Sequence, residues 1–167
     1  GMNRASGCSK SAKITAGSVV VNTSAQINSH TNVFTASART QNANVAELTA
    51  LARAVGAKGE VYAQTPKPSP RLLERLKSPA MANVILLVRK FEDPAPPEVK
   101  DLDLVTLMFN YHDFEHFGVD RARLNAAVFA ALKPGGMYVI ADHSGRPGTG
   151  VSESGTLHRI EESVVRR

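Results

Sequence analysis

The stretch from Asp101 to His143 constrains the fold more than any other part of the chain. It contains two apolar runs of strand length, Leu104 to Phe109 and Met137 to Ala141, which are typical of parallel strands buried on both faces. Between them a helix is predicted over 120–132, capped by Asp120 and ended by Lys133-Pro-Gly-Gly136. Its apolar stripe consists of Leu124, Val128, Ala131 and Leu132. Strand, helix, glycine turn and strand form a right-handed βαβ unit, so the predicted fold class is α/β.

The rest of the chain alternates strands and helices in the same way. Further strands are predicted over 32–37, 60–64 and 83–88. A helix over 45–55 is expected to be capped by Asn44, and a second helix to start at Ser69-Pro70. Residues 91–97 hold three prolines and are predicted to form a surface loop, and a helical tail is expected from Leu157. This alternation predicts a Rossmann-like, doubly wound, mostly parallel sheet over residues 32–167, after a polar lead-in over residues 1–31.

The positive charge of the chain is concentrated in its opening segment. Four bases and no acids precede Glu47, whereas the remaining residues hold sixteen bases against fifteen acids, within a net charge of +5. Aromatic residues make up only 5% of the chain, so stacking platforms are scarce and no nucleic-acid partner is expected. No apolar run approaches the ~20 residues of a membrane span, and the single cysteine, Cys8, suits a reducing compartment. A cytoplasmic location without membrane contact is therefore predicted.

Polar and ionisable residues follow the ends of the predicted strands, where ligands bind in open α/β sheets. They are Gln64, Glu92, Asp93, Asn110, Tyr111, His112, Asp113, Asp142 and His143. Because the last two strands are predicted neighbours, His112, Asp113, Asp142 and His143 are expected to meet in one cleft. Three interpretations stay open: a histidine and carboxylate pair for acid and base chemistry, a metal site without any recognised ligand spacing, or capping and hydrogen bonding alone.

The segment from Asp101 to Ile160 resembles a bacterial group of class I S-adenosylmethionine-dependent methyltransferases. The similarity lies in Asn110-Tyr-His-Asp113, Leu132-Lys-Pro-Gly-Gly136, Asp142-His143 and Leu157-His-Arg-Ile160. It extends more weakly to Leu51–Gly56 and Gly59–Ala63, and covers about two thirds of the chain. The resemblance implies a Rossmann-like sheet and transfer of a methyl group from S-adenosylmethionine, and the resemblance does not identify the acceptor. A small-molecule substrate is expected.

The sequence departs from this group around the expected cofactor site. The turn after the first strand, expected at about Arg39 to Val45, lacks both the glycines and the acidic residue of the group. Gln64 stands where an acid would hold the ribose hydroxyls, while Glu92 and Asp93 fall in the expected adenine-contacting loop. The sequence also stops before the antiparallel strands that normally complete the sheet, so a truncated version of the fold is expected.

Three functions are compatible with these patterns. In an active methyltransferase, Gln64, Glu92 and Asp93 would contact the cofactor, and Asn110, Tyr111, Asp142 and His143 would line the substrate side. His112 or Asp113 would accept the proton of the methyl acceptor, while the protein positions the two reactants. The alternative is a degenerate relative that keeps the fold without binding the cofactor, and the third is another small-molecule or metal enzyme.

A homodimer is also expected, because the strand over 137–141 would leave an apolar sheet edge.

Overall fold

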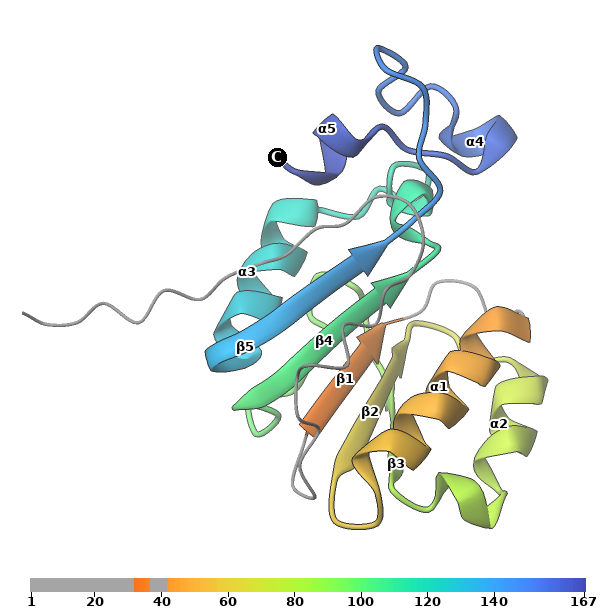
Figure 1. Cartoon of the computed structure of the whole chain (residues 1–167), viewed down its shortest axis with the longest axis vertical. Helices are drawn as coiled ribbons and strands as arrows, with labels where there is room; N and C mark the ends of the chain where they lie inside the picture. Colours follow the sequence, from red (N-terminus) through yellow and green to blue (C-terminus); the bar gives the residue numbers. More distant parts are fainter. Residues whose placement is uncertain (1–31, 37–41) are drawn as a thin grey trace, which may run out of the picture.

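The computed structural model describes residues 32–36 and 42–167, which form a parallel five-stranded sheet with helices on both faces (Figure 1). The strand order is β3-β2-β1-β4-β5. The strands are β1 (Asn32–Ala36), β2 (Glu60–Thr65), β3 (Val84–Val88), β4 (Leu102–Met108) and β5 (Leu132–Ala141). This arrangement confirms the predicted Rossmann-like, doubly wound α/β fold. The polar lead-in predicted for residues 1–31 lies outside the described residues.

Helices cover both faces of the sheet, as expected for a doubly wound fold. α1 (Asn42–Val55) and α2 (Pro70–Leu76) lie on one face, and α3 (Arg121–Ala131) lies on the other (Figure 1). Two single-turn 3-10 helices, η1 (Pro79–Met81) and η2 (Tyr111–Phe114), lie between these elements in the chain. Two short helices, α4 (Ser154–Leu157) and α5 (Glu162–Val165), follow the last strand.

Each face of the sheet packs into its own hydrophobic core. Along β4, Val105 and Leu107 pack with Leu124 and Val128 of α3, whereas Leu104, next to Val105 in the strand, packs with the core under α1 and α2. Val33, Val61 and Ala63 of β1 and β2 belong to this second core, together with Leu48, Ala52 and Val55 of α1. Because side chains alternate between the faces of a strand, strands buried on both sides have the continuous apolar runs seen in the sequence.

Two of the predicted helix starts are confirmed by their hydrogen bonds. The side chain of Ser69 accepts a hydrogen bond from the backbone of Leu72, with Pro70 at the first helical position, and Asp120 accepts one from the backbone of Arg123. The predicted cap at Asn44 is wrong, because α1 begins at Asn42. The start of a helix was therefore predicted correctly where the cap was followed by a proline or carried a carboxylate.

The last strand begins at Leu132, earlier than the predicted start at Met137. Leu132 pairs with Leu102, and the register between the two strands shifts before Leu104 pairs with Met137. Gly136 lies against the neighbouring strand, because a Cβ at this position would be 2.6 Å from the carbonyl oxygen of Leu102. The Lys-Pro-Gly-Gly sequence is therefore an irregular part of the strand, and only glycine allows this close approach.

The segment after β5 folds over the carboxyl ends of the strands (Figure 1). Ser144 forms a parallel bridge with Ile160, and the backbone NH of Ile160 donates to the carbonyl of His143. Arg146 forms an ion pair with Glu153, and Glu161 accepts a hydrogen bond from the backbone of Gly150. Of the helical tail expected from Leu157, α5 is present over Glu162–Val165. α4 ends at Leu157, because His158 has a left-handed backbone conformation with φ 54°.

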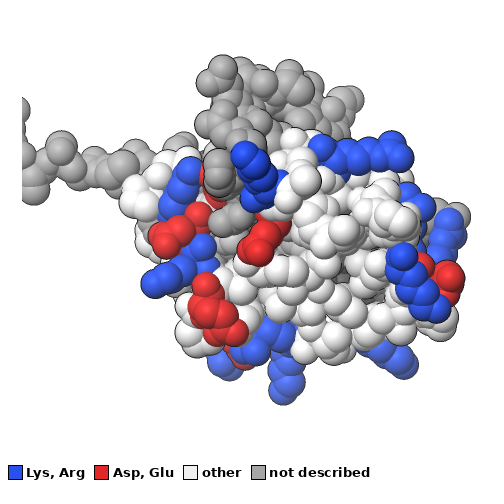
Figure 2. All heavy atoms as spheres, turned by 90° about the horizontal axis from the view of Figure 1, so that it is seen from below, with Lys and Arg blue, Asp and Glu red and all other residues white. Residues whose placement is uncertain are grey.

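The surface at the amino ends of the strands has mixed charge. Figure 2 views this end of the molecule and shows Lys and Arg side chains interspersed with Asp and Glu. Within residues 32–36 and 42–167, no helix is both long and apolar enough to cross a membrane.

Candidate functional site

The candidate site is centred on Asp142, which immediately follows β5. Its Oδ2 accepts a hydrogen bond of 2.8 Å from the backbone NH of His112, and its Oδ1 accepts one of 2.7 Å from the backbone NH of His143. Oδ1 also lies 2.8 Å from Nδ1 of His112. One carboxylate thus joins the ends of β4 and β5 and fixes the orientation of the His112 ring.

The local sequence after β4 explains why His112 reaches Asp142. The backbone NH of Phe109 donates to the carbonyl of Ala141, which continues the pairing with β5 beyond Met108. Phe109 then has φ 58°, a left-handed conformation that turns the chain, and Asn110 closes a single helical turn by accepting from the backbone of Asp113. This turn is η2, and it places His112 above the end of the neighbouring strand.

The hydrogen bond to Asp142 determines which nitrogen of His112 is available for chemistry. An ionised carboxylate only accepts hydrogen bonds, so Nδ1 carries the hydrogen and donates to Oδ1. In the neutral ring, Nε2 then has a lone pair. Nε2 is 3.4 Å from Oδ1 of Asp113, within ion-pair distance, but it has no partner of hydrogen-bond geometry among the described residues. His112 and Asp113 are 2% and 3% exposed, so this lone pair is held in a largely desolvated place.

The structure adds a residue that was not predicted to be part of the site. His158 lies beside His112, with 5.3 Å between their ring centroids. His112, Asp113 and His158 each offer a ligand atom within 4.8 Å of the other two. The Leu157-His-Arg-Ile160 motif was the sequence feature that could have indicated His158 as a site residue. Only the fold brings this distant segment back to η2.

Two predicted substrate-binding residues point elsewhere. The ring of His143 packs against Phe109, with centroids 5.3 Å apart, and His143 reaches the site through its backbone. Tyr111 is 2% exposed and packs against Phe114 in the hydrophobic core. Of the four residues expected to meet, His112, Asp113 and Asp142 do so through their side chains, and the binding roles of His143 and Tyr111 stay predictions.

Two buried amide side chains flank the end of β1. Gln64 near the end of β2 is 1% exposed, and its Nε2 donates to the carbonyl of Arg89 at 2.6 Å. Asn110 after β4 is completely buried. Within the described part of the chain, Oε1 of Gln64 and both polar side-chain atoms of Asn110 have no hydrogen-bond partner. A buried amide atom without a partner is costly, so such atoms indicate positions where a polar ligand would be accommodated.

The two predicted cofactor carboxylates are engaged in the loop that follows β3. Oε1 of Glu92 accepts a hydrogen bond of 3.3 Å from the backbone of Asp120, and Asp93 forms an ion pair with Arg89. The hydrogen bond from the Arg89 guanidinium lowers the pKa of the Asp93 carboxyl below its ordinary value. Neither carboxylate belongs to the group formed by His112, Asp113 and His158, and their contact with a cofactor stays a prediction.

Comparisons with known proteins show what the fold has in common with others. No family model and no curated protein matches the sequence. Among solved structures, the chain is similar to a SAM dependent methyltransferase from Aquifex aeolicus, with a TM-score of 0.56 and 20% sequence identity. The match covers 70% of this chain but only 60% of that one. The chain has a methyltransferase-like fold. At this identity the likeness concerns the fold, and it agrees with the class of fold implied by the sequence resemblance.

Proposed function

We propose that this protein is an S-adenosylmethionine-dependent methyltransferase whose cofactor lies over the carboxyl ends of β1, β2 and β4. The observation that supports this most directly is the pair of buried amides, Gln64 and Asn110. In the sheet order β3-β2-β1-β4-β5, they stand on either side of β1. The direction of strand connection reverses between β1 and β4, and this reversal is where ligands of doubly wound sheets bind.

In the resemblance to class I methyltransferases, Gln64 falls where an acidic residue binds the ribose hydroxyls, and we propose that it binds them here. Its Oε1 can accept a hydrogen bond from a hydroxyl, while the bond from its Nε2 to Arg89 fixes the orientation of the amide. Asn110 can both donate and accept. Each buried polar atom left without a partner costs about 1–3 kcal/mol, and a polar cofactor would recover part of this cost.

The His112 and Asp142 pair supports proton acceptance from the methyl acceptor. Methyl transfer forms a bond from the acceptor to the methyl carbon and breaks the bond from that carbon to the sulfonium sulfur. The proton of the acceptor would pass to Nε2 of His112, and Asp142 would stabilise the resulting imidazolium through Nδ1. Asp113, 3.4 Å from Nε2, would stabilise the same positive charge. The predicted acceptor is a small molecule.

Calorimetric titration of the purified full chain with S-adenosylmethionine and then S-adenosylhomocysteine tests the proposal. We expect micromolar binding and a matching thermal stabilisation, which amounts to about 2.7 kcal/mol at a ligand concentration 100 times the dissociation constant. Asn110→Ala and Gln64→Leu should weaken binding at least tenfold. Asn125→Ala is the matched control, because Asn125 also has a buried amide oxygen without a partner but lies in α3.

The alternative is a degenerate relative that keeps the fold without the cofactor. The engagement of Glu92 by the backbone of Asp120 and of Asp93 by Arg89 favours this alternative. No detectable heat from either ligand would support it and contradict the proposed methyl transfer. Equal weakening by Asn125→Ala and Asn110→Ala would contradict the location of the site.

We also propose that the protein forms a homodimer through β5. Within the described sheet β5 is an edge strand, paired only with β4, and exposed edges favour pairing with another strand. Light scattering at micromolar concentration should give twice the mass of one chain, and the mass of a single chain would contradict this proposal.

A further inference from the structure

We propose that His112, Asp113 and His158 form a binding site for a divalent transition-metal ion of the zinc type. Their ligand atoms all lie within 4.8 Å of one another. η2 supplies the first two residues, and the segment after α4 supplies the third. This site goes beyond the proposed methyl transfer, because the three side chains are assembled by the protein alone and need no cofactor.

His112 is already oriented as a metal ligand. Metal-binding histidines characteristically donate their second ring NH to a carboxylate, which fixes the ring and makes the other nitrogen a better donor. Asp142 provides this contact at 2.8 Å and also holds the backbone NH of His112. Nε2 of the 2% exposed His112 points toward Asp113 and has no hydrogen-bond partner among the described residues. A buried nitrogen without such a partner is the independent indication of a ligand here.

The charges around His112 also favour a cation. The side chains of Asp113 and Asp142 are each 4% exposed and both lie against the same imidazole. Even a protonated His112 would provide one positive charge between two buried carboxylates. Burial of a charge is costly unless it is paired or coordinates a metal. A divalent ion bonded to Asp113 and to Nε2 would add positive charge directly beside these carboxylates.

His158 supplies the third ligand from a segment that is fixed on both sides of it. Before it, the backbone NH of Leu157 donates to the carbonyl of Glu153, and after it, that of Ile160 donates to the carbonyl of His143. The His158 side chain itself is on the surface, so its ring can turn toward an ion. Ligand atoms of a tetrahedral zinc site are about 3.3 Å apart, given zinc–nitrogen bonds of about 2.0–2.1 Å. Separations of up to 4.8 Å would therefore close by at most about 1.5 Å when zinc binds.

The donor atoms determine the class of metal. Two imidazole nitrogens and one carboxylate oxygen suit Zn²⁺, Co²⁺ and Ni²⁺ better than Mg²⁺ or Ca²⁺, which prefer oxygen ligands. Three protein ligands leave a position for water or another oxygen. Because the metal would use the lone pair of His112 Nε2, metal binding and proton acceptance at this atom exclude each other. A bound ion would instead lower the pKa of an oxygen that it coordinates.

The test is a titration of the purified full chain, stripped by a chelator and free of S-adenosylmethionine. Zn²⁺ is followed by calorimetry, and Co²⁺ by its visible absorption bands. We expect one ion per chain at micromolar or tighter affinity, and a higher melting temperature with Zn²⁺ than with chelator. His158→Ala should weaken binding at least tenfold without lowering the melting temperature of the metal-free protein. Asp142→Asn should weaken it by 10–100-fold by releasing the His112 ring.

Two controls address other histidines and the cysteine. His143→Ala should bind Zn²⁺ like the unmodified chain, because its ring packs on Phe109 outside the three ligands. A double variant, Cys8→Ser with His30→Ala, removes candidate ligands from the part of the sequence outside the described residues and should also retain binding. The proposal is overturned if no Zn²⁺ binds, if His158→Ala binds as tightly as the unmodified chain, or if binding is lost in the double variant. Cofactor binding is titrated separately on the stripped protein, so failure of either proposal leaves the other measurable.

Discussion

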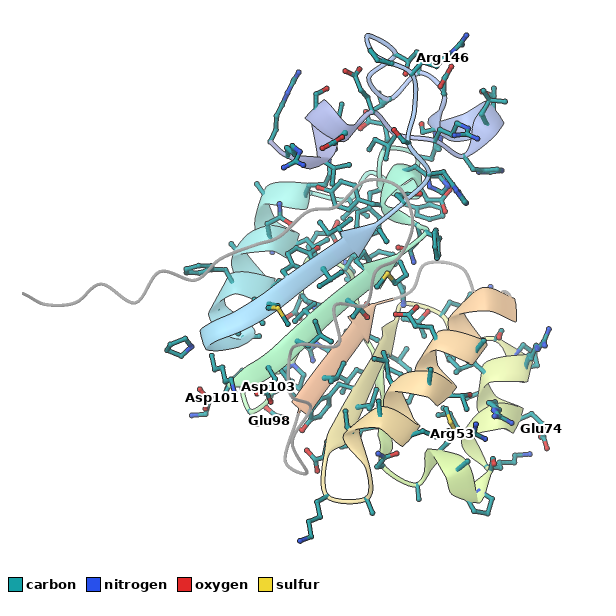
Figure 3. All side chains as sticks on the ribbon, viewed as in Figure 1. Arg53, Glu74, Glu98, Asp101, Asp103 and Arg146 are labelled. Carbon is teal, nitrogen blue, oxygen red and sulfur yellow. The ribbon has the colours of Figure 1, made fainter. Side chains whose placement is uncertain are left out.

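The two ends of the sheet differ in how they treat polar groups. At the carboxyl end, Gln64, Asn110 and His112 are buried, and each has a side-chain atom without a hydrogen-bond partner among the described residues. At the amino end, Lys133 forms an ion pair with Asp103, and Gly136 allows close packing of β5 on β4. Figure 3 shows Glu98, Asp101 and Asp103 together at this end of the molecule, opposite Arg146 in the C-terminal segment.

We expect the amino end of the sheet to contribute to stability and the carboxyl end to contribute to ligand binding. Exposed or paired charges cost little, and close backbone packing stabilises, so the amino end is consistent with a structural role. Buried polar atoms without partners reduce stability, and at the carboxyl ends of the strands, where ligands bind in such sheets, they are candidate ligand contacts. Variants at the amino end should therefore change stability alone, whereas variants at the carboxyl end should change binding.

The largest expected effect on stability is an exception to this separation. Asp142→Ala removes the acceptor of two backbone NH groups and of the His112 ring, so we expect a loss of about 3 kcal/mol in the free energy of unfolding. Urea unfolding measures it. Asp142→Asn retains one acceptor oxygen and should lose clearly less, and equal losses in the two variants would show that the hydrogen bonds are not the cause.

The next effect is at the amino end. In Gly136→Ala, the new Cβ would be 2.6 Å from the backbone oxygen of Leu102, which cannot move aside as a flexible side chain would. We expect a loss of about 1–3 kcal/mol in unfolding free energy, with unchanged cofactor affinity at a temperature where the variant is folded. Urea unfolding and calorimetry measure the two quantities. Stability within 0.5 kcal/mol of the unmodified chain would mean that the strands separate without cost at this point.

A smaller effect is expected at the start of α3. Asp120→Ala removes the hydrogen bond from the backbone of Arg123 and should reduce stability by about 1 kcal/mol, as for other helix caps. Asp120→Asn keeps an oxygen in the same position and is the control. Thermal unfolding of both variants distinguishes the lost cap from the lost charge, since a purely electrostatic effect would reduce the stability of both equally.

The smallest effect concerns acid stability of the segment after β5. The side-chain hydrogen bond from Arg146 lowers the pKa of Glu153 below its ordinary value of 4.5, and the backbone of Gly150 does the same for Glu161. A lowered folded pKa stabilises the fold above pH 4.5 and ceases to do so as the pH falls through the folded value. The hydrogen-exchange protection factors over 145–161, corrected for the intrinsic exchange rate at each pH, should therefore fall below pH 4.5. Arg146→Gln should reduce this pH dependence, and an identical profile in the variant would exclude the Arg146 contact as its source.

The sequence predicted the elements of the sheet better than their ends. Apolar runs located β3 and β4 to within a few residues, and Ser69, Pro70 and Asp120 marked two helix starts correctly. β5 was predicted too short, because Lys133-Pro-Gly-Gly136 is typical of a turn and the pairing of Leu132 with Leu102 is not visible in one strand alone. Local patterns describe how a segment can fold, but strand pairing depends on a partner distant in sequence.

For the candidate site, the sequence alone placed Asp142, His112 and Asp113 near one another, because the ends of neighbouring parallel strands must meet. The tertiary structure alone decided that His143 turns to Phe109, that Tyr111 enters the core, and that His158 returns to His112. The reason is physical. The pairing of the last two strands follows from the connection rule for a βαβ unit, whereas the direction of a side chain follows from the contacts available around it. Those contacts include the Ser144 and Ile160 bridge, which joins segments that the sequence separates.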